Sequence, residues 1–200
     1  MTRMGGPAVV RSGPTGASPV QRDGEACVTV RGRDEQRSTV DTSRKIQVSK
    51  VIAAPAADVF ALLADPGRHQ EIDGAGMLQG LETDSPPLSG VGQTFVMKMH
   101  QDAMGDYRMV NKVTALVPDA RIGWEPTLDP GCELAATLGD MQVGGHTYTF
   151  DLADQGDGTT KVTETYEWMS VKDEKFLEML PLLSEEQLAA SLDKIEQAVG

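Results

Sequence analysis

The sequence has few cysteines, few aromatic residues and no long apolar run. Two cysteines among 200 residues are too few for a disulfide framework, and we expect Cys132 to be a buried free thiol. No stretch approaches the roughly 18 consecutive apolar residues that a membrane-spanning helix requires. The first thirty residues also lack the apolar core of a secretory signal. We therefore expect a cytoplasmic protein that does not insert into a membrane.

Motifs of several enzyme classes are missing as well. The sequence contains no G-x-x-x-x-G-K-[ST] phosphate loop, no G-x-G-x-x-G after a strand and no G-x-S-x-G elbow. Its three histidines show no metal-ligand spacing, and the stretch DLADQGDG lacks the closing Glu of a calcium loop. The sequence therefore predicts neither a cofactor nor a metal site.

Positive charge is scarce beyond the first 44 residues. The formal net charge is −12, although residues 1–44 carry seven arginines against five acidic residues. The acidic remainder would repel phosphate backbones and anionic lipid surfaces. We therefore expect no nucleic-acid partner.

The first 44 residues are rich in Gly, Pro, Ser, Thr and Arg and show no helical or strand periodicity. Such a segment cannot bury enough apolar surface to offset its ordering entropy, so we expect residues 1–44 to be a disordered extension. An alternative is that translation begins at Val40, since some bacterial starts use a valine codon, and that residues 1–39 are not made. Under either interpretation, residues 45–200 form a single domain.

The remaining sequence predicts strands and helices in a clear order. KIQVSKVIA alternates as a strand, AADVFALLAD has helical spacing, and PGRHQEID is a short second helix. Five or six antiparallel strands follow, and QGDG at residues 155–158 connects two of them as a hairpin. A short helical segment, DEKFLEML, precedes a long amphipathic helix that opens at Ser184 with a capping box. This order predicts an α+β fold.

Three motifs occur in a familiar order across residues 45–199: KVIAAPAADVFALLADPGRHQEIDG, NKVTALVPDARIGWEP and GDGTTKVTETYEW. They resemble the motifs of the polyketide cyclase/dehydrase and lipid-transfer (SRPBCC) superfamily, the START-like or birch-allergen-like group. The resemblance implies a helix-grip fold, in which a curved antiparallel sheet wraps around the long carboxy-terminal helix. It also implies an apolar cavity between sheet and helix. One departure is Ile72, where this superfamily often has a tryptophan.

The resemblance implies three kinds of function, because members of the superfamily differ in activity and a fold does not determine function. The first hypothesis is that a monomer or homodimer binds a hydrophobic small molecule, such as a lipid, polyketide or isoprenoid. The second is a polyketide aromatase/cyclase or dehydrase that acts on a ligand in the same cavity. The third is a protein-interaction module like the chaperone activators, which needs no cavity.

Alternation along each strand predicts which side chains face inward. The candidate ligand contacts on these faces and on the last helix are Met97, Met99, Met109, Asn111, Trp124, His146, Tyr148, Glu164, Tyr166, Trp168, Leu188 and Leu192. Methionine adapts its shape and often lines sites for variable apolar ligands. The alternative is that these side chains fill a solid core.

Glu164, His146 and Tyr148 are the candidate catalytic residues. A desolvated carboxylate has its ionised form disfavoured, which suits a general acid or base. The alternative for Glu164 is a structural carboxylate paired with a neighbouring cation or hydroxyl. The alternative for His146 is an interior or rim histidine whose hydrogen bonds are satisfied.

The cluster RHQEIDG places His69, Glu71 and Asp73 at i, i+2 and i+4. This spacing does not put all three on one helical face, and it does not fit a metal site. We expect Asp73 and Gly74 to form a turn that ends the short helix. His69 and Asp73 would then pair at the surface.

Overall fold

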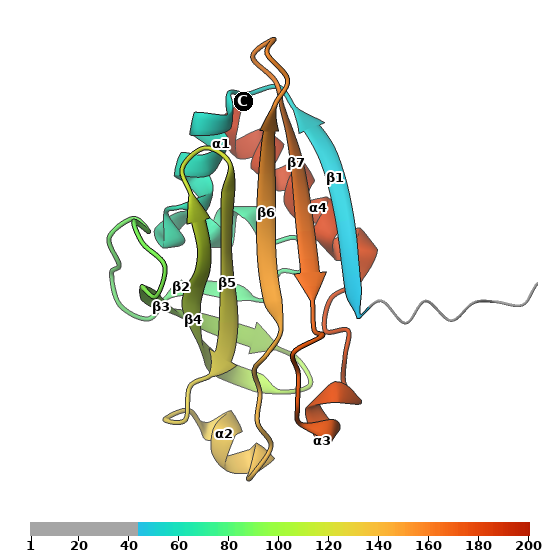
Figure 1. Cartoon of the computed structure of the whole chain (residues 1–200). Coiled ribbons are helices and arrows are strands. Elements are labelled where there is room, and N and C mark those ends of the chain that lie inside the picture. Colours follow the sequence, from blue (N-terminus) through green and yellow to red (C-terminus); the bar gives the residue numbers. More distant parts are fainter. Residues whose placement is uncertain (1–43) are drawn as a thin grey trace, which may run out of the picture. The chain divides into compact units, whose positions relative to one another are not determined.

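The computed structural model describes residues 44–200, which form a curved antiparallel sheet with a long helix against it (Figure 1). The expectation of disorder for residues 1–44 and the alternative start at Val40 concern residues that, apart from residue 44, lie outside this described part. No helix in the described part is both long enough and apolar enough to cross a lipid bilayer.

The elements follow the order that the sequence predicts. The strands are β1 (Lys45–Ile52), β2 (Leu78–Leu81), β3 (Thr94–Gln101), β4 (Gly105–Val117), β5 (Arg121–Leu128), β6 (Thr147–Asp154) and β7 (Thr160–Glu167). The helices are α1 (Ala56–Leu63), the 3-10 helix η1 (Pro66–Ile72), α2 (Glu133–Leu138), α3 (Glu174–Leu177) and α4 (Glu185–Val199). The predicted α+β helix-grip fold, with its two short helices after the first strand, is confirmed.

The strands form one sheet in the order β1-β7-β6-β5-β4-β3-β2, and every neighbouring pair is antiparallel. The first strand, β1, therefore forms one edge of the sheet and pairs with the last strand, β7. The predicted hairpin at residues 155–158 joins β6 to β7, and its Gly156 and Gly158 adopt positive φ, which a side chain would disfavour. The register of this hairpin places Tyr148 opposite Tyr166 and Phe150 opposite Glu164.

The long helix α4 begins with the predicted capping box, in which Ser184 and Gln187 satisfy each other's backbone N–H groups. Its apolar face is fully buried at Leu188 and Leu192. Gly74 fixes the docking of α4, because a Cβ at this position would overlap the Gln187 carbonyl oxygen. The Gly74 N–H also donates to Ser191 Oγ at 3.0 Å. The turn after η1 therefore sits directly on the helix backbone.

One helix, α2, is absent from the sequence-based expectations. It has only six residues, and its N-cap residue Cys132 makes no side-chain cap hydrogen bond. Periodicity cannot identify so short a segment. Leu134 on α2 packs with Tyr107, Met109 and Cys132, which is a buried free thiol as expected.

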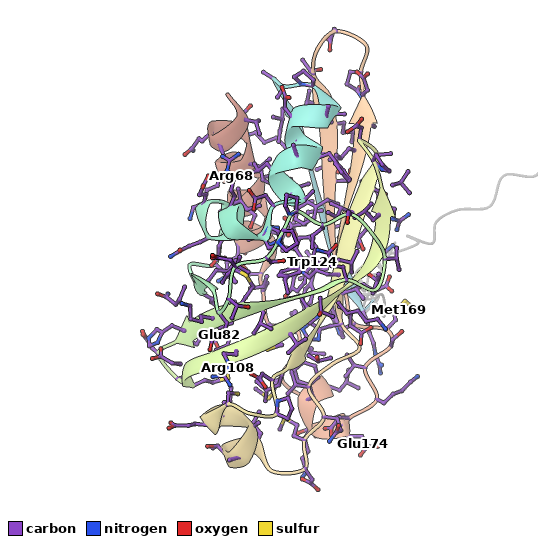
Figure 2. The ribbon with its side chains drawn as sticks, turned by 90° about the vertical axis from the view of Figure 1, so that its left-hand side faces the viewer. Arg68, Glu82, Arg108, Trp124, Met169 and Glu174 are labelled. Atoms are coloured by element: carbon purple, nitrogen blue, oxygen red, sulfur yellow. The ribbon has the colours of Figure 1, made fainter. Side chains whose placement is uncertain are left out.

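The two ends of the sheet are packed differently. Figure 1 shows α1 near the β6–β7 hairpin, with α2 and α3 at the opposite end. Buried branched aliphatic side chains from α1, α4 and the strands they cover form what we call the packed end: Ile52, Val59, Leu62, Leu63, Ile122, Leu152, Val162 and Ile195. Figure 2 shows Trp124 in the interior between the two ends, whereas Arg68 and Glu174 lie at the surface.

Candidate functional site

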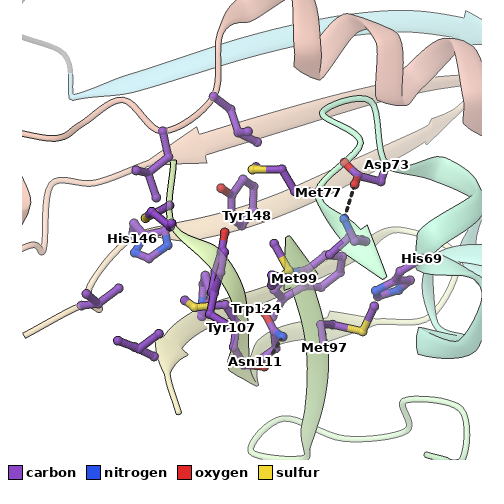
Figure 3. A pocket seen from close by; sticks show the side chains of 18 of the residues that line it. His69, Asp73, Met77, Met97, Met99, Tyr107, Asn111, Trp124, His146 and Tyr148 are labelled. Carbon is purple, nitrogen blue, oxygen red and sulfur yellow. Dashed lines mark hydrogen bonds between the residues drawn. The ribbon is translucent and has the colours of Figure 1, made fainter. Parts of the chain in front are cut away.

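A cavity of about 170 Å³ lies between the concave face of the sheet, η1 and the segment that connects β7 to α4. Figure 3 shows its lining, with His146 at one side and His69 and Asp73 at the other. Most of the lining is apolar, and six methionines contribute to it: Met77, Met97, Met99, Met104, Met109 and Met179. Together with α2 and α3, these residues define what we call the cavity end.

Eight of the twelve candidate ligand contacts line this cavity: Met97, Met99, Met109, Asn111, Trp124, His146, Tyr148 and Glu164. Alternation on β3 to β7 therefore predicts the inward face, since these residues come from five strand regions far apart in the sequence. That they contact a ligand stays a prediction.

The other four candidates, Tyr166, Trp168, Leu188 and Leu192, are not among the lining residues. The two leucines lie on the buried face of α4 and are completely buried in the core, so they do not reach the cavity. Tyr166 is also fully buried and stacks on Tyr148, with ring centroids 4.8 Å apart and planes 10° apart. The ring centroid of Trp168 lies 5.0 Å from that of Tyr166. Alternation gives the face of a side chain, but not whether another side chain stands in front of it.

Glu164 extends from β7 into the cavity and is only 4% exposed. Its Oε2 has no hydrogen-bond partner among the described residues. Burial first, and then the negative charge of Asp73, raise the pKa of this carboxyl to about 8. The group is therefore mainly protonated at neutral pH, so it offers a hydrogen-bond donor as well as an acceptor. Among residues 44–200, Oε2 therefore lacks the cation or hydroxyl partner that the alternative of a structural carboxylate requires.

His146 immediately precedes β6 and is 1% exposed. Its Nδ1 also lacks a hydrogen-bond partner among the described residues, and its ring lies 5.2 Å from that of Phe176. Burial lowers its pKa to about 4, so the imidazole is neutral at neutral pH. A neutral ring has one donor and one acceptor nitrogen, and here Nδ1 is left without a partner.

The remaining polar groups of the cavity are neutral or already bonded. Burial raises the pKa of the Tyr148 hydroxyl well above its ordinary value, and burial with the charge of Asp73 raises that of Tyr107 to about 12. Asn111 donates from Nδ2 to the Met109 carbonyl at 3.2 Å. The cavity therefore presents hydroxyl, amide, imidazole and carboxyl groups rather than an ion pair.

His69 corrects a sequence-based expectation, because it is not at the surface and does not pair with Asp73. It is 3% exposed, its Nε2 donates to the Leu63 carbonyl at 2.9 Å, and its ring stacks on Trp124 at 4.9 Å. Burial lowers its pKa. The Asp73 carboxylate instead accepts the N–H groups of Ala75 and Leu78, the latter shown as a dashed line in Figure 3.

A signal for the position of His69 does exist in the sequence. Pro66, His69 and Ile72 are the buried residues of η1 and recur every three residues, which is the period of a 3-10 helix. Reading η1 with this period places His69 inside. The segment between β7 and α4 offers no such signal. The sequence therefore does not predict its contributions to the lining: Phe176, Met179, Leu182 and Leu183.

Within residues 44–200 no group of three His, Cys, Asp or Glu residues is placed to hold a metal ion.

Comparison with known proteins identifies relatives across the described domain. The family model described as "Activator of Hsp90 ATPase homolog 1-like protein" matches residues 53–200. The uncharacterized protein Rv0088 of Mycobacterium tuberculosis is 32% identical over 124 residues, which cover 62% of this chain and 47% of that protein. The chain therefore spans about half the length of the curated relatives it matches.

Solved structures share the fold at low sequence identity. Protein Ms6760 from Mycobacterium smegmatis aligns with a TM-score of 0.56 and 16% identity, covering 78% of this chain and 91% of that one. Truncated norcoclaurine synthase from Thalictrum flavum aligns with a TM-score of 0.53 and 18% identity, covering 78% and 93% respectively. At these identities the likeness shows the fold alone, and it confirms the predicted resemblance at that level.

Proposed function

Because the chain belongs to the Activator of Hsp90 ATPase homolog 1-like family of the SRPBCC superfamily, we propose that it binds a hydrophobic small molecule in the cavity. One observation carries the proposal: a mainly apolar cavity with unpartnered polar atoms occupies one end of a sheet whose other end is packed with aliphatic side chains. Small-molecule sites combine such an apolar lining with a few polar groups that fix orientation.

The energetics favour occupation. Atoms that line a cavity lose dispersion contacts on one side, and a ligand restores these contacts while it buries its own apolar surface. Flexible methionine side chains can adjust to the shape of the ligand at little cost. Apolar cavities of about 150 Å³ stay dry and hold benzene, so a volume of about 170 Å³ suits a molecule of one or two rings or a short chain. Lipid, polyketide and isoprenoid fragments of that size meet this description.

Equilibrium dialysis against biphenyl tests the proposal. We expect saturable binding by the wild-type protein and loss of binding in Leu138→Trp, because Leu138 lies in the lining on α2 and the larger ring would occupy the cavity. Val117→Trp is the matched control, since Val117 is 52% exposed and lies outside the lining. Equal binding by both variants would show that biphenyl is held elsewhere and would contradict the proposal.

A second candidate, an aromatase/cyclase or dehydrase activity, is favoured by the buried, mainly protonated Glu164. A neutral carboxylic acid in an apolar site can donate a proton to a developing oxyanion or leaving hydroxide, and a held geometry adds to the rate. The test is the cyclisation and dehydration of a linear poly-β-keto thioester, in which an intramolecular aldol addition first forms the hydroxyl that then leaves as water. We expect Glu164→Gln to abolish turnover if Glu164 is the acid, whereas unchanged turnover would remove it from the mechanism.

The third hypothesis, a protein-interaction module, receives less support. Activation of the Hsp90 ATPase belongs to the family's description, and an interaction surface would be expected to group apolar side chains. In the described part of the chain the large exposed apolar side chains come from separate segments: Val51, Val91, Val117, Met169 and Met179. Apolar side chains that are exposed singly are normal for a surface. Ligand binding is therefore the function we propose.

A further inference from the structure

We propose that the ligand is an uncharged, elongated molecule that carries one hydrogen-bonding oxygen near each end, one end bonded by Glu164 and the other by His146. This inference rests on the proposed function, since it assigns a chemical class to the ligand of the same cavity. It goes further in that it specifies how many polar groups the ligand has and where they lie.

The first step is the position of the two residues along the sheet. Glu164 on β7 lies opposite Phe150 on β6, and His146 lies four residues before Phe150. Side chains at even positions share one face of β6, so both residues point to the cavity side. A rise of about 3.3 Å per residue separates them by about 13 Å along the strands.

Between these two positions the cavity is bordered by an aromatic ring. Tyr148 lines the cavity there, and Tyr166, its cross-strand partner outside the lining, stacks on its ring. The ring of His146 lies 6.1 Å from each of these two rings. Glu164 lies on the other side of this pair, where the negative charge of Asp73 contributes to its raised pKa. The two polar groups therefore stand at opposite sides of the Tyr148 ring, which we expect to contact the flank of a ligand.

The second step is that both residues have an atom in need of a partner. Glu164 and His146 are each more than nine-tenths buried, both line the cavity, and they hold the unpartnered atoms Oε2 and Nδ1. Leaving a buried polar atom unpaired costs on the order of 1–3 kcal/mol, so native proteins rarely tolerate one without a reason. A ligand with an oxygen at each end removes both penalties at once.

The third step is the charge of the ligand. Burial keeps both groups mainly neutral at pH 7, and the neighbouring Asp73 carboxylate disfavours a further anion at the Glu164 end. An ionised ligand end would have to leave water for a cavity whose described lining includes no Lys or Arg to pair with it. Hydroxyl and carbonyl oxygens carry no such cost, and each can pair with a carboxylic acid or an imidazole.

A rigid probe series tests this assignment: biphenyl, 4-hydroxybiphenyl and 4,4′-dihydroxybiphenyl share one frame and carry no, one and two terminal oxygens. By equilibrium dialysis at pH 7 we expect affinity to rise about tenfold with each hydroxyl, the gain of one well-placed hydrogen bond. We expect biphenyl-4-carboxylate to bind more weakly than 4-hydroxybiphenyl. A wild-type protein that binds all three neutral probes equally would overturn the inference while leaving the proposed function intact.

Variants assign the two ends. Glu164→Leu and His146→Phe are each expected to lower the affinity for the dihydroxy probe about tenfold, and the double variant to bind all three probes as it binds biphenyl. Glu167→Leu is the matched control, because it places the same change on the opposite face of β7. The folded state of each variant is checked by thermal unfolding, and the wild-type series stands independently of them. Failure of every probe to bind, biphenyl included, would defeat the proposed function and this inference with it.

Discussion

The packed end and the cavity end of the same sheet differ in how their side chains fill the interior. At the packed end, branched aliphatic side chains such as Leu62 and Ile195 are essentially fully buried and hold α1 and α4 on the sheet. At the cavity end, six methionines surround space that no described side chain fills, and two polar atoms lack partners within residues 44–200. Side chains of fixed shape specify a unique core, whereas flexible ones tolerate varied contents. Stability and binding are therefore concentrated in different halves of one fold.

The largest expected effect is a truncation at the packed end. Leu62→Ala should lower the free energy of unfolding by about 2–5 kcal/mol, because it opens a new void in a dense core. Met99→Ala at the cavity end should cost clearly less, because the side chain is only partly buried and already borders the cavity. Urea unfolding of both variants measures the difference. Equal losses would mean that the two ends are packed alike.

A substitution that removes the buried carboxyl should stabilise the ligand-free protein. Glu164→Leu replaces an unpartnered polar group by an apolar one of similar size, so we expect a gain of about 1–3 kcal/mol. Glu167→Leu, on the opposite face of the strand, should change stability by less than about 0.5 kcal/mol. If Glu164→Leu is instead destabilising by a comparable amount, the carboxyl has a partner and the cavity end is a conventional core.

The pH dependence of stability should be specific to the cavity end. The folded-state pKa of Glu164 is raised from 4.5 to about 8, so the native state holds this proton more tightly than the unfolded chain. Its contribution is fully present below about pH 4.5 and is lost as the pH rises toward 8. The stability of the wild type relative to Glu164→Gln should therefore fall between pH 5 and 8, by up to about 1.4 kcal/mol per pH unit.

Comparing the wild type with Glu164→Gln cancels the contributions of the three histidines to the pH dependence, which differ in sign from one another. The lowered pKa values of His69 and His146 oppose the trend below pH 6.5, and the raised pKa of exposed His100 adds to it above that value. All three are present in both proteins. A difference that does not vary with pH would show that Glu164 ionises normally.

The smallest expected effects are volume-conserving exchanges. Leu63→Met at the packed end and Met109→Leu at the cavity end should each cost less than about 1.5 kcal/mol. Only the second should change the affinity for biphenyl, because Met109 lines the cavity and Leu63 does not. If both exchanges alter binding equally, the cavity is not confined to its end of the sheet.

How far the sequence predicts the molecule also differs between the two ends. Period-two alternation places Glu164 and Trp124 on the inward face, and the capping box locates the start of α4, because both are local patterns with a fixed geometry. The depth of Tyr166 and the burial of His69 depend on which side chain from a distant element stands in front. Such contacts leave no periodic trace in a single sequence.

The central claim, that the cavity end holds an apolar ligand, is tested most directly by methionine-methyl NMR during a biphenyl titration. The methyl signals of Met97, Met99 and Met109 in the lining should shift and saturate together. Met169, which is 61% exposed and outside the lining, serves as the control within the same spectrum and should stay unchanged. Cavity methyl signals that do not move while biphenyl binds, or a response confined to Met169, would contradict the account.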